Sequence, residues 1–175
     1  HTQSSAASDV YKRQAQVLLS HEDLKDQNRS SNIKESIKNI LSLGAIPIIN
    51  ENDSVSTEEI EFGDNDQLSG NVAKLICSDL LIILTDQDGV FDKNPTMNKN
   101  AKLLNEIKFT NVDKLEIEFG KAGEYGRGGM KTKLLAAENY LNPNNKMYIA
   151  NGKSENILLD ILSENRVGTL IRLAN

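Results

Sequence analysis

Short apolar runs alternate along the chain with segments of helical periodicity. Buried strands are predicted where apolar residues stand side by side, at 45–49, 80–84, 146–150 and 168–172. Helices are predicted where apolar residues recur every three or four positions, at 31–43, 68–76, 130–141 and 154–162, with a shorter one at 111–118. Continuous apolar strands that alternate with helices favour an α/β fold, in which helices cover both faces of a parallel sheet.

The start of the chain does not follow this pattern. Residues 1–14 are rich in Ser and Ala, show neither a helical nor a strand period, and lack the apolar stretch of a secretory signal. We expect them to be a poorly ordered or foreign segment. Residues 15–175 are then predicted to form one α/β domain that is incomplete at its N-terminus.

Composition narrows the chemistry. The net charge is −5 and the basic residues are spread out, which argues against a nucleic-acid-binding surface. No apolar run approaches the length of a membrane span. A single cysteine excludes an internal disulfide and fits the reducing cytosol, and with only two histidines the chain cannot build a zinc cage. Carboxylates, amides, lysines and backbone groups must therefore supply the function.

A glycine-rich segment precedes the helix predicted at 130–141. Residues 126–133 read Gly-Arg-Gly-Gly-Met-Lys-Thr-Lys. Bare backbone at a helix N-terminus can approach a phosphate closely and offer it free N–H groups, and Lys133 in the first turn could add a point charge. The spacing is not that of a Walker A motif. On these residues alone, a flexible loop with solvated lysines is an equally good interpretation.

Polar residues gather at two further points. Asp64, Asn65 and Asp66 stand before a predicted helix, where one Asp is commonly an N-cap. The second carboxylate indicates a cationic partner, such as an ammonium group, a lysine or a metal ion. Residues 50–53, Asn-Glu-Asn-Asp, follow a predicted strand; a turn is the favoured interpretation of that segment, and a site for an amino-acid head group is the alternative.

The strand predicted at 80–84 also runs into a polar loop. Its Asp88-Gly89 pair is an ordinary turn signal, and the acidic residues do not have calcium-loop spacing. In an α/β sheet, ligands bind beyond the carboxyl ends of the strands. We therefore expect the segments 50–53, 85–92 and 151–152 to gather at one edge, beside the N-termini of the two polar-headed helices.

The order of these motifs is more specific than any one of them. Asn-Glu-Asn-Asp, Gly-Asp-Asn-Asp, Leu-Thr-Asp-x-x-Gly-Val-Phe, Gly-x-Gly-Gly-Met-x-x-Lys and Val-Gly-Thr-Leu follow one another along the chain. In this order they resemble the amino-acid kinase family, most closely its glutamate-phosphorylating branch, over about residues 15–171. The resemblance implies a mostly parallel sheet sandwiched by helices.

The resemblance also implies an activity. The family branch uses MgATP to phosphorylate the side-chain carboxylate of L-glutamate, giving L-glutamyl 5-phosphate in the first step of proline biosynthesis. The resemblance implies a cytoplasmic enzyme that is a homo-oligomer at full length. Its partners would be the small molecules glutamate and ATP, and it would bind neither nucleic acid nor a membrane.

Residue roles carry over by position. Asp53, Asp64 and Asn65 resemble the residues that hold glutamate, Asp66 resembles the aspartate that positions the catalytic lysines, and Lys133 resembles the lysine that stabilises the transferring phosphoryl group. No metal ligand carries over. The nucleotide-binding positions are Thr85, Asp86, Arg127, Gly128, Gly129, Met130, Lys131, Thr132 and Lys133.

The chain departs from the family at its start. The family's first strand carries another lysine and a glycine-rich phosphate loop, and an early serine contacts glutamate; nothing before Ala15 matches them. We therefore expect the chain to be inactive alone. Two alternatives stay open: a kinase of the same fold for acetylglutamate, aspartate, carbamate or UMP, against which residues 63–66 argue, and a non-catalytic module that binds a nucleotide or an amino acid.

Overall fold

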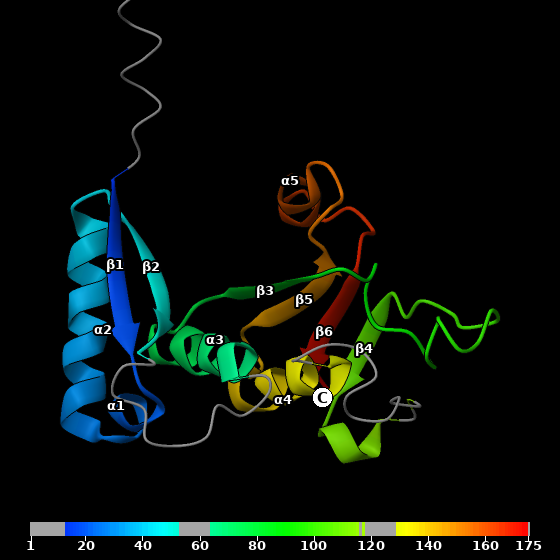
Figure 1. The fold of residues 1–175 in the computed structure, drawn as a ribbon, viewed down its shortest axis with the longest axis horizontal. Helices are drawn as coiled ribbons and strands as arrows, with labels where there is room; N and C mark the ends of the chain where they lie inside the picture. Colours follow the sequence, from blue (N-terminus) through cyan, green and yellow to red (C-terminus); the bar gives the residue numbers. More distant parts are fainter. Residues whose placement is uncertain (1–12, 53–63, 116, 118–128, 175) are drawn as a thin grey trace, which may run out of the picture. The chain divides into compact units, whose positions relative to one another are not determined.

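The computed structural model describes residues 13–52, 64–115, 117 and 129–174, apart from the side chain of residue 64. Its residue contacts define two compact units, His1–Glu59 and Ile60–Asn175, which are described separately. Figure 1 shows the elements of both. Within the described residues, no helix has both the length and the apolar character that crossing a membrane requires.

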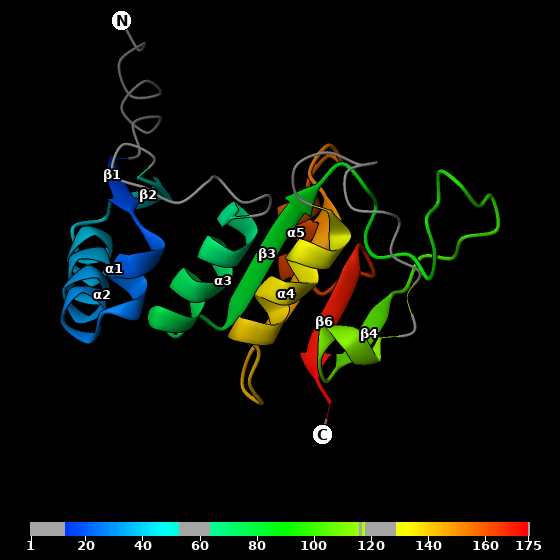
Figure 2. The same cartoon turned by 60° about the horizontal axis from the view of Figure 1, so that its bottom comes forward.

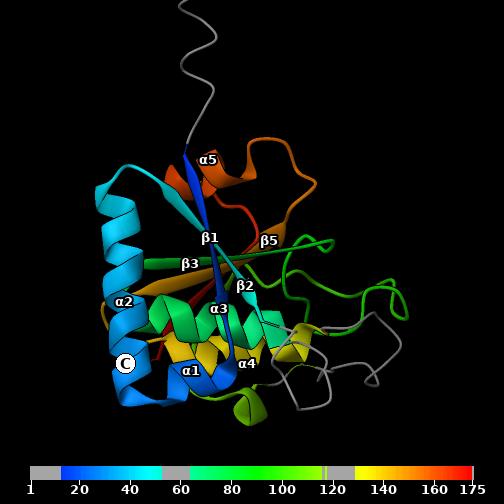
Figure 3. The ribbon, with the colours of Figure 1, turned by 60° about the vertical axis from the view of Figure 1, so that its left-hand side comes forward.

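The first unit consists of two parallel strands and two helices. Strands β1 and β2 align from Gln14 opposite Ile46 to Leu19 opposite Glu51. Helix α2 lies alongside β2 (Figures 1 and 3), and its Ile37 is only 1% exposed. The bounds are β1 Gln14–Leu19, α1 His21–Lys25, α2 Gln27–Ser42 and β2 Ile46–Glu51.

Local side chains start both helices of this unit. Ser20 and Asp23 form a capping box at α1: the Asp23 carboxylate accepts hydrogen bonds from the Ser20 N–H at 2.9 Å and from its hydroxyl at 2.7 Å. These bonds hold the pKa of Asp23 below its usual value. Asp26 caps α2 by accepting from the Arg29 N–H at 2.8 Å, and Gly44 follows that helix with φ +69°, which glycine adopts without strain.

The second unit is a four-stranded sheet with helices. The strand order is β3-β5-β6-β4; β3 pairs parallel with β5 and β4 parallel with β6, whereas β5 and β6 are antiparallel. The bounds are α3 Asp64–Leu75, β3 Leu80–Thr85, β4 Glu106–Phe109, η1 Val112–Lys114, α4 Met130–Tyr140, β5 Lys146–Asn151, α5 Ile157–Leu162 and β6 Thr169–Leu173.

Alternate residues of the strands supply two apolar clusters. Met147 and Ile149 of β5 belong to the larger cluster, with Leu134 and Ala137 of α4. The intervening residues Tyr148 and Ala150 belong to a smaller one, with α5 residues that include Ile161. Because successive side chains of a strand point to opposite faces, α4 and α5 cover opposite faces of this sheet. The α/β architecture with a mostly parallel sheet is therefore confirmed.

Several sequence predictions need correction. The helix predicted at 111–118 is a single 3-10 turn, Val112–Lys114, after which Leu115 is extended. The helix predicted at 154–162 begins only at Ile157. The sheet is not wholly parallel, because β6 begins beside the end of β5, with Thr169 opposite Ile149, and runs back in the opposite direction. Three elements that the pattern did not predict are β1, α1 and β4.

Candidate functional site

The topology of the second unit brings several polar segments to one edge. Helix α3 reaches β3 through residues 76–79, and α4 reaches β5 through residues 141–145. Both helices run against the strands that follow them, so their N-termini lie at the edge where β3 and β5 end, as Figure 2 shows. The predicted meeting of helix N-termini with the carboxyl ends of strands is therefore confirmed within this unit.

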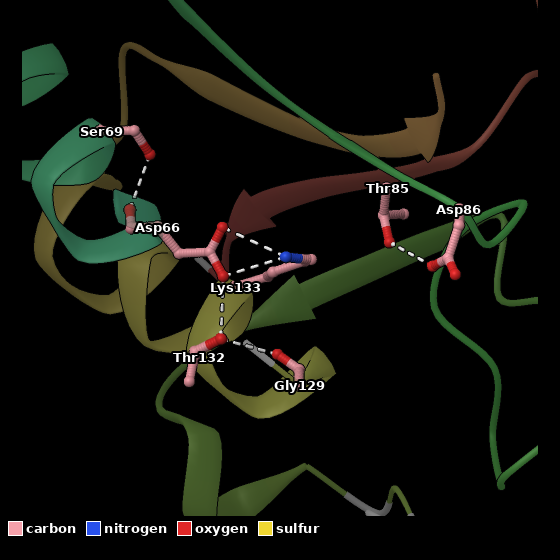
Figure 4. A network of polar contacts seen from close by, with 7 residues as sticks. All are labelled: Asp66, Ser69, Thr85, Asp86, Gly129, Thr132 and Lys133. Carbon is pink, nitrogen blue, oxygen red and sulfur yellow. Dashed lines mark hydrogen bonds and ion pairs between the residues drawn. The ribbon is translucent and has the colours of Figure 1, made fainter. Parts of the chain in front are cut away.

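An ion pair joins the beginnings of α3 and α4. The Lys133 Nζ lies 3.0 and 3.2 Å from the two carboxylate oxygens of Asp66 (Figure 4). Thr132 also donates its hydroxyl to the Asp66 carboxylate at 2.8 Å, and the same hydroxyl lies 2.7 Å from the Gly129 carbonyl oxygen. Ser69 donates to the Asp66 backbone carbonyl at 2.6 Å. Asp66 is thus held by three side chains.

The N-termini of two helices contribute positive partial charge to this junction. The two helices run in the same direction, so the positive ends of their dipoles lie together. Among the residues that the structure describes, no side chain caps α4 at Gly129, which leaves its first N–H groups unclaimed by a capping side chain from that part of the chain. The side chains of Lys133 and Asp66 are 13% and 16% exposed. Such a site, partly shielded from water and rich in donors, suits an oxyanion such as a phosphate.

A glycine lets the two helices approach closely enough for this contact. A Cβ built on Gly70 of α3 would lie 2.8 Å from the Ala136 carbonyl oxygen and 3.2 Å from the Ala136 Cβ. Any larger residue would push α3 and α4 apart. Sequence reasoning missed Gly70, although an isolated glycine within a helical pattern is a signal of close packing.

The ends of β3 and β5 are tied together at the same edge. The Gly152 N–H donates to the Thr85 carbonyl at 2.8 Å, and the Asn151 side-chain amide donates to the Asp88 carboxylate at 2.9 Å. The Thr85 hydroxyl lies 3.3 Å from an Asp86 carboxylate oxygen. In Figure 4, Thr85 and Asp86 stand apart from the Asp66 network.

The predicted glutamate-binding residues are described only in part. Asp53 lies outside the described residues. Asp64 and Asn65 are the first two residues of α3, and Asn65 is exposed there, directly before Asp66. Residues 50 and 51 end β2 in the other unit.

Among the predicted nucleotide-binding residues, Arg127 and Gly128 also lie outside the described part. Gly129 precedes α4, and Lys131 is exposed in its first turn. Met130 packs against the apolar cluster, and Thr132 faces Asp66. The structure therefore gives Met130 a packing contact and Thr132 a link to Asp66 that the sequence alone did not reveal.

The comparisons with known proteins come from sequence and from structure. The model of the "Amino acid kinase family" matches residues 2–151. Among curated relatives, "Glutamate 5-kinase" of Caldanaerobacter subterraneus subsp. tengcongensis is 46% identical over 89% of this chain and 42% of its own length. "Glutamate 5-kinase" of Acinetobacter baumannii is 46% identical over 97% of this chain and 45% of its own length. The chain thus spans less than half the length of these relatives.

Solved structures share the fold. An isopentenyl phosphate kinase of T. acidophilum superposes with a TM-score of 0.58 at 21% identity, over 92% of this chain and 60% of that one. The UMP kinase of Bacillus anthracis gives a TM-score of 0.60 at 18% identity, over 95% of this chain and 60% of that one.

Proposed function

The chain belongs to the amino acid kinase family, and we propose that it acts in the ATP-dependent phosphorylation of the side-chain carboxylate of L-glutamate. The product would be L-glutamyl 5-phosphate, formed in the first step of proline biosynthesis. Support for glutamate, rather than another acceptor, comes from relatives of 44–46% identity that carry the name glutamate 5-kinase.

The observation that carries the proposal is the ion pair of Lys133 and Asp66 at two helix N-termini. Phosphoryl transfer needs positioning and the stabilisation of negative charge more than covalent help from the protein. Lys133 has three N–H donors, and its contacts with Asp66 leave at least one for a phosphoryl oxygen. Asp66 fixes the ammonium group in place, which makes Lys133 the catalytic residue and Asp66 its positioning residue.

The reaction requires no general base. The glutamate side chain is ionised at neutral pH, so its carboxylate oxygen can attack the γ-phosphorus directly while the bond to the ADP oxygen breaks. Both reactants are anions. Lys133 and the N–H groups at the start of α4 would therefore act by lowering the repulsion between them and by stabilising the charge that spreads over the transferring group.

We assign the binding roles as follows. Asp53, Asp64 and Asn65 would hold glutamate, with a carboxylate facing its ammonium group. Thr85 and Asp86, at the end of β3, would hold the nucleotide together with the segment before and at the start of α4. That segment contributes Arg127, Gly128, Gly129, Met130, Lys131, Thr132 and Lys133.

Mg²⁺ would enter with ATP, because this ion keeps several waters and is commonly held through substrate phosphates. It would neutralise part of the phosphate charge, and we assign it no ligand from this chain. The full-length enzyme is proposed to be a homo-oligomer in the cytoplasm.

A substrate panel tests the proposal. The protein expressed from its complete reading frame is given MgATP with L-glutamate, acetylglutamate, aspartate, carbamate or UMP, and ADP release is measured. We expect the highest kcat/KM with L-glutamate. A higher value with UMP or aspartate would assign the chain to another branch of the family, and absence of transfer to every acceptor would favour a binding module.

A further inference from the structure

Asn151 makes three hydrogen bonds where β5 ends. It is the last residue of β5 and stands opposite Thr85, the last residue of β3. Its side-chain amide donates to the Asp88 carboxylate at 2.9 Å. The bond therefore reaches three residues beyond the point where the ladder between β3 and β5 ends.

The orientation of the Asn151 amide is fixed by its own turn. The side-chain oxygen accepts from the Lys153 N–H at 2.9 Å, and the Asn151 carbonyl accepts from the Ser154 N–H at 3.1 Å. Because the oxygen is occupied in this Asx-type turn, the amide nitrogen must face Asp88. The Asn151 turn thus orients the side-chain N–H group toward the Asp88 carboxylate.

The turn at residues 86–89 is also held at both of its ends through backbone groups of its own chain segment. Before it, the Thr85 carbonyl accepts from the Gly152 N–H at 2.8 Å. After it, the Val90 N–H donates to the buried Thr169 hydroxyl at 2.8 Å. Gly89 has φ +155°, and a Cβ there would lie 2.6 Å from the Thr169 hydroxyl oxygen. The backbone at this point is therefore closely packed against Thr169.

We infer that the Asn151–Asp88 hydrogen bond positions the Thr85–Asp86 segment for the nucleotide. This inference rests on the proposed function, because it concerns the same nucleotide site. The Gly152 N–H fixes the start of the turn and the Thr169 hydroxyl fixes its end, and Asn151 supplies an anchor between them. Neither Asn151 nor Asp88 was assigned to the site above, and each is a positioning residue that acts through Thr85 and Asp86.

Exchanging the two side chains tests the inference. MgATP is titrated into the protein expressed from its complete reading frame, and the dissociation constant is measured by calorimetry. Asn151→Asp places two carboxylates in contact, and we expect it to raise the dissociation constant about tenfold. In the double variant Asp88→Asn with Asn151→Asp, residue 88 donates and residue 151 accepts, while the net charge of the pair is unchanged. We expect this exchange to restore the dissociation constant to within about twofold of the original.

The chain contains a matched control pair. The Asn165 side-chain amide donates to the Asp160 carboxylate at 2.8 Å, so Asn165→Asp makes the same substitution in the same kind of bond. The neighbouring Glu164 forms an ion pair with Lys146 at 3.0 Å. Lys146 is the first residue of β5 and Asn151 is the last, so this ion pair involves the opposite end of the strand. We expect Asn165→Asp to leave the affinity for MgATP unchanged. Circular-dichroism melting of every variant measures the effect on the fold itself.

The outcomes separate the inference from the proposed function. If the original chain binds MgATP and Asn151→Asp binds it equally well, the inference is wrong while the nucleotide site stands. The inference also fails if the exchange does not restore binding, or if Asn165→Asp weakens binding as much. If the original chain binds no MgATP, the proposed nucleotide site is itself rejected, and the inference with it.

Discussion

Side chains tie α4 to α3 at one end and to the connection that follows α3 at the other, and the two links differ in chemistry. At the N-terminal ends, Lys133 pairs with Asp66 and both side chains keep some exposure to solvent. At the opposite ends, the Tyr140 hydroxyl donates to the Ser78 carbonyl at 2.9 Å, and Tyr140 is 1% exposed. A neutral bond therefore suffices to hold one end of the pair.

The difference indicates what the charges are for. Shielding an ion pair from water costs desolvation energy that its attraction does not always recover. Stability alone does not require charges at the N-terminal link, given that a phenol and a carbonyl serve at the other. The ion pair is what would be expected where an ammonium group must be held in place and still be reachable by a ligand. Three variants test what each of the two links contributes.

Removing the ammonium group should have the largest effect. We expect Lys133→Met, in the protein expressed from its complete reading frame, to lower the rate of glutamate phosphorylation by about a thousandfold or more, because the transferring group loses a positioned cation. The rate is measured as ADP release at saturating substrates. Lys74→Met, an exposed lysine in the last turn of α3, is the matched control and should keep the original rate. Equal rates for both variants would remove Lys133 from catalysis.

Separating the helices should lower stability. Gly70→Ala puts a Cβ 2.8 Å from the Ala136 carbonyl oxygen, and the overpacking is expected to cost about 1–3 kcal/mol, offset in part by about 1 kcal/mol from the better helix propensity of alanine. Urea unfolding measures the net loss. Lys74→Ala shortens an exposed side chain of α3 to alanine without adding an atom to the helix contact, and it should change the free energy of unfolding little. A Gly70→Ala protein as stable as this control would show that the close approach is dispensable.

Deleting the phenol hydroxyl should have the smallest effect. Tyr140→Phe leaves the Ser78 carbonyl without its 2.9 Å donor, which is expected to cost about 0.5–1.5 kcal/mol in the free energy of unfolding. The affinity for MgATP should not change, because the bond lies at the far end of the helix pair. A loss of nucleotide affinity would instead couple the two ends.

The same variant tests an alkaline effect. Burial raises the pKa of Tyr140 above its ordinary value, and the hydrogen bond with Ser78 offsets part of the increase. The phenol thus keeps its proton to a higher pH when folded, so its contribution to stability is complete below the unfolded pKa of about 10 and is lost as pH rises through the folded pKa. Urea unfolding from about pH 9 to about pH 11, around that pKa, should show a smaller loss of stability for Tyr140→Phe than for the original protein. Parallel losses in the two proteins would assign the alkaline effect to other groups.

The elements that the sequence predicted best are those with strong apolar patterns. The strand predicted at 146–150 became Lys146–Asn151, and the helix predicted at 130–141 became Met130–Tyr140. By contrast, β4 has only four residues, Glu106–Phe109, of which every second one is buried. An alternating apolar pattern over only four residues cannot be distinguished from a loop by sequence. The pairing of β4 with β6 was therefore revealed only by the structure.

The site divides in the same way. The glycine-rich start of α4 and the carboxylates before α3 were visible as local patterns in residues 126–133 and 64–66. Their union was not, because Asp66 and Lys133 lie 67 positions apart in the chain and periodicity says nothing about which helices become neighbours. The direction of β6 was also beyond reach, since an apolar run has the same composition in either orientation.

The buried hydroxyl of Thr169 has a consequence for engineering. It accepts a hydrogen bond from the Val90 N–H at 2.8 Å and donates one to the Leu104 carbonyl at 2.6 Å. It therefore joins the two ends of the excursion, the loop formed by residues 91–103. Within that excursion, Phe91 and Leu103 form a further bridge. Because Thr169 holds the two ends of this loop together, the loop can be lengthened or given a reporter tag near the exposed Met97 without disturbing the strand ends. This tip is the natural point at which to attach a probe.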